Sequence, residues 1–243
     1  MTNVAKSTST ITSREKKLVT ELVNHYKANQ VFFKKMAEQL ASAVHNSPAL
    51  MSYVHSTKWR IKDPKSLKDK LFRKIKIAKQ KGRKHNLSTA NLFTRINDLA
   101  GFRILHLHTE QIIGIDRELR EVFKESRYAL AEKPKARTWD DESRNFYKAH
   151  GIRPVASPQM YTSVHYVIKP NNRTRLTCEI QVRTLAEELW GEVDHAMNYP
   201  HLSPVATCRE QIKVLARVTS SCSRLVDSIY RARASRRHAK EKM

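Results

Sequence analysis

The sequence predicts an α/β (α+β) fold in which a mixed β-sheet is flanked by helices. Two neighbouring runs, 161–168 and 176–183, alternate between polar and apolar residues with the period of a β-strand. Residues 170–172, Pro-Asn-Asn, lie between them and have the composition of a turn. Other segments carry apolar residues at the spacing of one helix face. Together these patterns predict helices interleaved with about four or five strands, at least two of them antiparallel.

Length and composition limit the function. The 243 residues suit one domain with extensions and can bury a core. The net charge of +23 is extreme and indicates a polyanionic partner, such as nucleotide phosphates, RNA or an acidic surface. The three cysteines lack the spacing of a disulfide framework or a zinc site. No apolar run approaches the roughly 18 residues of a membrane span, and the start is polar, so we expect a cytoplasmic protein without a membrane partner.

The chain should begin with a disordered stretch, 1–12, and continue as a helical extension, 13–54. Thr12 and Glu15 form a capping box at the start of the first helix. Apolar stripes then follow over 13–46, as one long helix or a helical pair. Lysines decorate this segment. A solvated face is the simpler interpretation of these lysines, and an RNA-facing surface is the alternative.

A second helix is predicted to begin at Asp63, a good N-cap that is followed by proline at the first helical position. Arg60 and Lys62 come just before this N-terminus, which already attracts anions. Lys70 lies one turn beyond Ser66 on the same helix. Because the chain has five glycines and neither a P-loop nor a Rossmann fingerprint, side-chain cations must hold any phosphates.

Segment 95–105 is expected to run from a short helix into a strand. Asp98, at the mouth of this strand, is a candidate magnesium ligand, and a turn or N-cap aspartate is the alternative. Arg103, within the strand, could hold phosphate or could pair with Asp98. Thr109 is expected to cap a further helix. Another strand is predicted over 128–132, followed by a long polar loop.

That loop, 133–159, leads into the predicted hairpin. A turn centred on Asn172 would set three pairs opposite one another: His165 with Glu179, Ser163 with Gln181, and Tyr161 with Arg183. One sheet face then carries an aromatic ring, a hydroxyl, an imidazole, a carboxylate, an amide and a guanidinium. The simpler interpretation is the solvated face of an amphipathic hairpin. A register slip of one residue would move a whole set to the other face.

Thr184 is a natural N-cap with Glu187 three residues on, so a helix should start there and end at 198–200. On this helix Trp190 and His195 are expected to be structural, although His195 could reach the sheet face. Glu192 and Asp194 are expected to lie on its surface or to support the site. A last helical stripe covers 205–230. The basic tail after it is expected to be frayed or to face RNA.

These residues also carry a family resemblance, in several ordered motifs: Arg60-x-Lys62-x-x-x-Ser66-x-x-x-Lys70, Asp98-Leu99-Ala100-Gly101-x-Arg103, Tyr161-x-Ser163-x-His165, Glu179-Ile180-Gln181-Val182-Arg183-Thr184, Trp190 and Asp194-His195. Together they resemble the synthetase domain of the RelA/SpoT family. The resemblance covers roughly 55–200 and leaves a C-terminal helix and basic tail at 201–243. It implies a nucleotidyltransferase-like synthetase fold. Since no hydrolase motif precedes it, the chain is expected to be a stand-alone small alarmone synthetase.

The resemblance implies transfer of the β,γ-pyrophosphate of ATP to the 3′-hydroxyl of GDP or GTP, giving (p)ppGpp. A first set of residues would bind ATP: Arg60, Lys62, Ser66, Lys70 and Arg103. A second set would bind the acceptor: Tyr161, Ser163, His165, Gln181 and Arg183. Asp98 and Glu179 would be the catalytic pair and would hold Mg²⁺, with Glu179 as general base or sharing that duty with the metal.

The acceptor remains open at this stage. The chain has Ser157-Pro158-Gln159-Met160 where alarmone synthetases commonly show Lys-Pro-Asn-Gly before the stacking tyrosine. This departure and the charge of +23 favour, as an alternative, a toxin that modifies the 3′-CCA end of tRNA. A non-catalytic RNA-binding module is a third hypothesis. Small members of the family are often homo-oligomers, and nothing in the composition tests that.

Overall fold

A computed structural model describes residues 10–172, 175–199 and 202–241 of the chain. Most of the predicted disordered start, residues 1–9, lies outside the described residues. The strands are β1 (Ser56–Ile61), β2 (Ala100–His106), β3 (Tyr128–Thr138), β4 (Arg153–Ala156), β5 (Ser163–Pro170) and β6 (Cys178–Thr184). The helices are α1 (Ser13–His45), α2 (Pro48–Met51), α3 (Pro64–Gln80), α4 (Leu92–Arg95), a 3-10 turn (Asn97–Leu99), α5 (Gln111–Glu125), α6 (Asp141–Ala149), α7 (Leu185–Asn198) and α8 (Ala206–Glu241).

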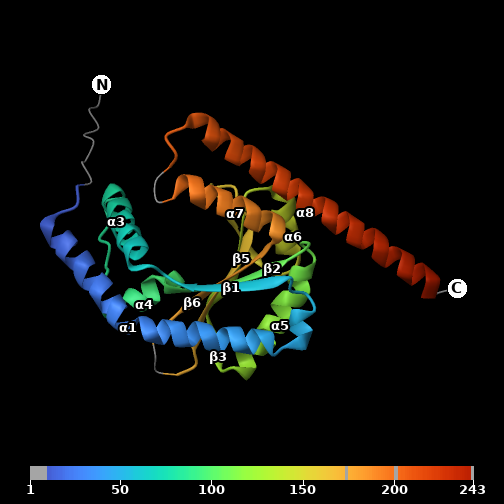
Figure 1. Cartoon of the computed structure of the whole chain (residues 1–243), viewed down its shortest axis with the longest axis horizontal. Helices are drawn as coiled ribbons and strands as arrows, with labels where there is room; N and C mark the ends of the chain where they lie inside the picture. The colour runs from blue at the N-terminus through green and yellow to red at the C-terminus, as the bar shows by residue number, and fades with distance from the viewer. Residues whose placement is uncertain (1–9, 173–174, 200–201, 242–243) are drawn as a thin grey trace.

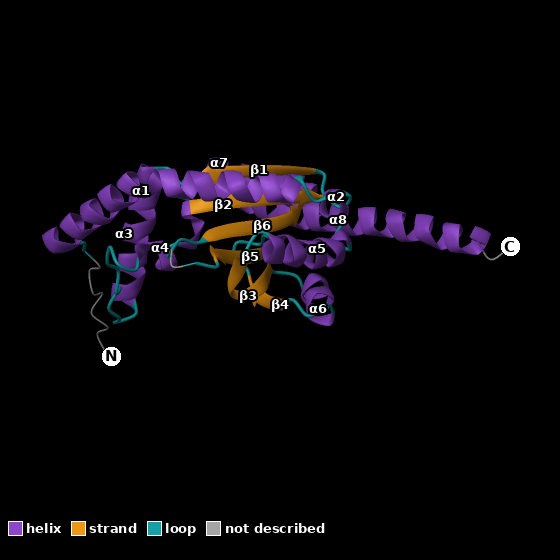
Figure 2. Cartoon of the chain, turned by 90° about the horizontal axis from the view of Figure 1, so that it is seen from below, coloured by secondary structure: helices purple, strands orange, loops and turns teal. Residues whose placement is uncertain are grey.

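The strands form one mixed sheet in the order β1-β2-β6-β5-β3-β4, which can be followed down the molecule in Figure 2. β2 pairs with β6 in parallel, as β3 does with β4, and the remaining neighbours are antiparallel. The predicted mixed sheet with flanking helices is therefore confirmed. The described residues contain six strands rather than four or five, because β1 and β4 were not predicted.

Helices cover both faces of the sheet. Figure 1 shows α1 and α5 on one side, and α7 and α8 on the other. The apolar residues of the central strands face α1, and Phe102, Ile104 and Ile180 are fully buried there. The opposite face keeps its polar side chains, so it is the face on which a site can form.

Local capping explains where three of the helices begin. The Thr12 hydroxyl accepts from the Glu15 backbone N–H, and the Glu15 carboxylate accepts in return from the Thr12 N–H, so the capping box is confirmed. α1 then continues unbroken to His45 as one helix. The Asp63 carboxylate accepts two backbone N–H groups at the start of α3, and Thr184 caps α7.

The predicted register of the hairpin is wrong by two residues. His165 lies opposite Gln181, not Glu179, and Val167 lies opposite Glu179. β5 runs to Pro170 but β6 begins only at Cys178, so the connection lies mostly on the β6 side. Because the shift is even, the same side chains still share one face.

Three other expectations are corrected. Segment 133–159 is not a loop, since β3 extends to Thr138 and α6 and β4 follow it. The N-cap of α5 is Glu110, and not Thr109. The tail expected to be frayed continues as α8 to Glu241, and Figure 1 shows this helix extending beyond the body of the molecule. None of the helices in the described parts of the chain combines the length and apolarity needed to cross a bilayer.

Candidate active site

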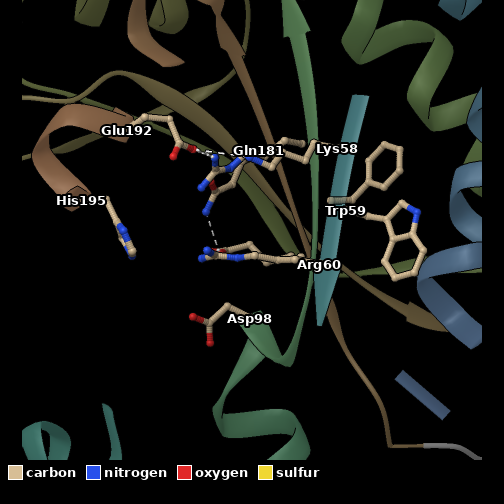
Figure 3. Close-up of a pocket in the computed structure, with 11 residues that line it drawn as sticks. Lys58, Trp59, Arg60, Asp98, Gln181, Glu192 and His195 are labelled. Atoms are coloured by element: carbon tan, nitrogen blue, oxygen red, sulfur yellow. Dashed lines mark hydrogen bonds and ion pairs between the residues drawn. The ribbon is translucent and has the colours of Figure 1, made fainter. Parts of the chain in front are cut away.

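The polar face of the sheet is hollowed between α3 and α7. A cavity of about 130 Å³, the central cavity, is lined by charged and polar side chains from several elements, including Arg60, Asp98, Arg103, Glu179, Glu192 and His195. Figure 3 shows Arg60, Asp98, Glu192 and His195 directed toward the same space, with Trp59 on the opposite side of β1. A more open hollow, the side groove, continues from it and shares Gln181 and His195 with it.

Strand register explains why the cavity has an open floor. Arg60 on β1 pairs with Gly101 on β2, and Gly101 pairs in turn with Glu179 on β6. Side chains on paired positions point to the same face of a sheet. Glycine therefore leaves an empty place between a guanidinium and a carboxylate, and that place is part of the cavity.

Asp98, in the 3-10 turn before β2, is held by two lysines from a distant part of the chain. Lys62 Nζ lies 2.9 Å from one carboxylate oxygen, and Lys70 Nζ lies 2.7 Å from the other. Burial alone would raise the pKa of Asp98, but Lys70 and Lys62 outweigh it and bring the pKa to about 2. Asp98 is thus ionised at neutral pH, and the expected alternative, that it pairs with Arg103, is wrong.

Glu179 is fixed by its neighbours on the sheet. His165 donates from Nδ1 to Oε1 at 3.0 Å, and Gln181 donates from Nε2 to Oε2 at 3.0 Å. Burial alone would raise the pKa of Glu179, but the hydrogen bond and charge of His165 outweigh it, so the pKa lies below its usual range. His165 still reaches Glu179 because the two-residue shift leaves them as diagonal neighbours.

Two of the three predicted arginines, Arg103 and Arg183, are neutralised by α7. Arg103 lies 2.8 Å from Glu188 and 2.6 Å from Glu192, and Arg183 pairs with Glu188 on its other side. Gly191 makes room for this arrangement, since a Cβ there would come within 2.5 Å of Arg183 Nη1. Sequence reasoning did not predict these pairs. The one available signal was the spacing of Glu188 and Glu192, which puts both on the same face of a helix.

Not all of the residues predicted to bind the acceptor line the side groove. Tyr161, His165, Gln181 and Arg183 line the side groove, where Arg73 of α3 joins them. Ser163 is 1% exposed, and its hydroxyl donates to the Val182 carbonyl, so it lines neither hollow. Ser66 also lines neither hollow, and its backbone N–H donates to the Asp63 carboxylate at the start of α3. His195, which was expected to be structural, lines both hollows.

The donor set fits a metal ion only in part. In the described residues no three His, Cys, Asp or Glu side chains gather as a metal site would require. Asp98 and Glu179 line the same cavity as two ionised carboxylates. Mg²⁺ is commonly bound through one or two carboxylates, with water and substrate phosphates as its other ligands. The pair therefore fits a magnesium ion that is bound together with a phosphate substrate.

The fold resembles several solved structures. Small alarmone synthetase 1 from Bacillus subtilis, bound to its product pppGpp, superposes with a TM-score of 0.58 at 18% identity, covering 88% of this chain and 99% of that one. The same protein bound to AMPCPP gives 0.54 at 16% identity over 87% and 99%. A GTP pyrophosphokinase family protein from Streptococcus pneumoniae gives 0.51 at 17% identity over 96% and 98%. At such identities the likeness establishes the fold.

No curated protein matches the chain by sequence. A family model does match, over residues 59–203, which is more than half of the chain, and it is described as the region found in RelA / SpoT proteins. The matched region begins in β1 and ends beyond α7, so it contains the side groove and every residue that lines the central cavity except Lys58. This chain belongs to the RelA/SpoT family.

Proposed function

We propose that the chain is an ATP pyrophosphokinase that transfers the β,γ-pyrophosphate of ATP to the 3′-hydroxyl of GDP or GTP, forming (p)ppGpp. One observation carries the proposal: two ionised carboxylates, Asp98 and Glu179, line one cavity among cationic side chains. Family membership supports it, as does the likeness to synthetases bound to pppGpp and AMPCPP. Transfer of a phosphorylated group needs this combination, because charge must be neutralised while the two substrates are aligned.

The triphosphate would lie along the cationic side of the central cavity. Arg60 points into the cavity, and Lys62 and Lys70 converge on Asp98. An incoming triphosphate offers these lysines a second anion, so they would bridge it to Asp98 rather than leave the aspartate. Arg103 could turn to phosphate only by leaving Glu188 or Glu192. Side-chain cations thus do the work that a glycine-rich loop does elsewhere.

The reaction forms one bond and breaks one. The acceptor 3′-oxygen attacks the β-phosphorus of ATP, the bond from that phosphorus to the α,β-bridging oxygen breaks, and AMP leaves. The acceptor loses one proton, and Glu179, ionised and directed by His165 and Gln181, is the proposed base. Mg²⁺ bound by Asp98 and Glu179 would supply charge neutralisation of the phosphates.

The acceptor nucleotide would occupy the side groove. Tyr161 offers a ring for stacking on a base, and the Trp190 ring lies behind it, with centroids 6.2 Å apart and planes inclined by 16°. Gln181 and His195 line both hollows, so an acceptor in the side groove would lie next to ATP in the central cavity. Arg73 would give the groove positive charge for acceptor phosphates, and Arg183 lines it while paired with Glu188.

A second candidate is a toxic pyrophosphokinase that modifies the 3′-CCA end of tRNA. The net charge of +23 favours it, since a nucleotide alone needs far fewer cations. The residues 157–160 also depart from the family's pattern immediately before Tyr161. An adenine ring could stack on this tyrosine as well as a guanine could, so the tyrosine does not discriminate between the two acceptors.

The experiment that tests both candidates is an acceptor assay with ATP labelled at the γ-phosphate. The purified chain is incubated with magnesium and, in separate reactions, GDP, GTP, ATP alone and deacylated tRNA. The proposal expects label in a guanosine product. Label only in the tRNA band would establish the second candidate, and tight, salt-sensitive RNA binding without any transfer would leave a non-catalytic RNA-binding module.

A further inference from the structure

The segment that carries Tyr161 is held by α7 and by a small core that α7 forms with α8. Met160, immediately before the tyrosine, has a φ of +63°, a left-handed conformation that is uncommon for a residue with a side chain. Such a conformation persists where the surroundings impose it, and such residues cluster at functional sites. Met160 and Tyr161 both pack against a small separate core formed by Trp190, Ile212 and Ala216.

The next residue is anchored by a buried carboxylate. The Thr162 backbone N–H donates to Glu187 Oε2 at 3.0 Å, and both residues are buried, with 8% and 5% of their surface exposed. Glu187 lies in the first turn of α7, and its own N–H is capped by Thr184. Its carboxylate is therefore used for the backbone beside Tyr161 and not for the helix that carries it.

Trp190 lies one turn further along α7 and supports the tyrosine ring itself. The two rings are stacked, and the indole Nε1–H donates to the Ile212 carbonyl of α8 at 3.0 Å. α7 thus contacts this segment at two points that lie one turn apart. Glu187 binds its backbone, and Trp190 packs against the tyrosine ring. α8 fixes the second point from behind.

We propose that Glu187 and Trp190 are positioning residues that set the affinity for the acceptor by holding Tyr161 in its stacking position, an inference that rests on the proposed pyrophosphokinase activity. Neither residue binds ATP. Glu187 faces Arg183, Asp140 and Tyr147 across a small polar cavity and does not line the central cavity. Loss of either contact should therefore impair the acceptor step and leave ATP binding unchanged.

The test uses a matched pair of buried carboxylates. Glu187→Leu removes the acceptor for the Thr162 N–H. Asp227→Leu removes an equally buried carboxylate that accepts the Glu110 N–H at 3.2 Å and pairs with His108, and that makes no described contact with 160–162. Glu187→Leu leaves one donor without its partner and Asp227→Leu leaves two, so the control should cost at least as much stability. In Glu187→Leu we expect the KM for the acceptor to rise about tenfold while the KM for ATP stays within about twofold, and in Asp227→Leu both should stay near wild type.

Glu187→Gln and Trp190→Leu complete the set. The glutamine amide oxygen can accept the Thr162 N–H, so this variant should restore the acceptor KM, even if Glu187→Leu folds poorly. Trp190→Leu removes the ring behind Tyr161 and should raise the acceptor KM as Glu187→Leu does. An unchanged acceptor KM in Glu187→Leu, or an equal rise in Asp227→Leu, would overturn the proposal.

Amide hydrogen exchange of the peptide spanning 157–163 separates this inference from the activity. We expect exchange about tenfold or more faster in Glu187→Leu and Trp190→Leu than in Asp227→Leu and wild type. If wild type transfers no pyrophosphate, the proposed function fails, and this measurement still decides whether Glu187 and Trp190 hold the segment. Equal exchange in all four proteins contradicts the positioning role.

Discussion

The two walls of the candidate active site are built in different ways. One side, the lysine wall, comprises β1, α3 and β2 and presents Lys62 and Lys70 around Asp98. The other, the tyrosine wall, comprises β5, β6 and α7 and presents Tyr161 and Glu179. Ion pairs between Asp98 and two lysines organise the lysine wall. Buried hydrogen bonds and ring packing hold the tyrosine wall from behind the groove. The two walls therefore depend on different kinds of interaction.

Removing one charge from each wall should have the largest effect. Asp98→Asn and Glu179→Gln keep the size of the side chain and lose the carboxylate. We expect each to lower kcat for pyrophosphate transfer by at least about 10²–10³-fold, the usual cost of removing an electrostatic contact to the transition state. Circular dichroism and thermal unfolding check that both variants remain folded. Full turnover by both would remove the site assignment.

The next largest expected effect is on the pH dependence of stability, to which the two walls contribute differently. Burial raises the pKa of Glu187 to about 7, whereas the lysines bring that of Asp98 to about 2. A carboxyl with a raised folded-state pKa contributes stability below its ordinary value of about 4.5 and loses it as the pH rises through 7, on the order of 3 kcal/mol here. Asp98 contributes nothing to the slope between pH 5 and 8. Burial lowers the pKa of His106 to about 4, so this group adds stability in both proteins as the pH rises toward 6.5. Urea unfolding should therefore show wild type losing stability over that range relative to Glu187→Gln. Equal slopes would contradict the raised pKa.

The lysine wall can be tested by itself. Lys62→Ala should raise the KM for ATP by roughly 10–30-fold, since a charge-assisted hydrogen bond contributes about 1.5–2 kcal/mol. Lys68→Ala is the matched control, because Lys68 lies exposed on α3 and makes no described contact with Asp98. Steady-state kinetics with ATP varied at saturating acceptor measure both. The same rise in both variants would indicate a diffuse charge effect instead of a site.

Gly191 offers a steric test of the tyrosine wall. A methyl group there would meet Arg183 Nη1 at 2.5 Å, so Gly191→Ala must move the guanidinium that lines the groove. We expect the acceptor KM to rise about three- to tenfold, with little change for ATP, as for the loss of one partly satisfied contact. A larger change in the ATP KM than in the acceptor KM would contradict the division into two walls.

The smallest expected effect is a gain in apparent affinity for ATP. Glu192 is 51% exposed and competes with phosphate for Arg103 at the edge of the cavity. Glu192→Gln should release part of that guanidinium and lower the KM for ATP about two- to threefold, the scale of an exposed ion pair. Titration at low and high salt checks the cause, because an electrostatic gain shrinks as salt rises. A higher KM for ATP would instead make Glu192 a contributor to binding.

The two walls also differ in what the sequence could predict. Asp63 with Pro64, and Thr184 with Glu187, are local signals, so the starts of α3 and α7 were predicted correctly. Alternation correctly predicted that His165 and Glu179 share a face. Their register was wrong because it depends on where the 171–177 connection sits, which alternation does not encode.

Other features depend on distant partners. β2 and β6 pair in parallel although residues 101–106 and 179–184 lie far apart in the chain, and only that pairing brings Arg103 and Arg183 under the same helix. β1 is an edge strand with largely exposed, polar side chains. It was not predicted because its sequence does not differ from the basic residues that precede α3. The contact of Glu187 with the Thr162 N–H was missed, because a position near the helix cap accounted for Glu187 from the sequence alone.

Phosphorus NMR of the reaction tests the central claim most directly. Wild-type protein is mixed with ATP, GDP and magnesium, and the spectrum is followed with Asp98→Asn as the control. Transfer at this site predicts that AMP and a nucleotide carrying a new 3′-diphosphate appear in equal amounts, and that neither forms with the variant. ADP and inorganic phosphate in their place, or an unchanged spectrum with GDP, GTP and tRNA in turn, would contradict the account.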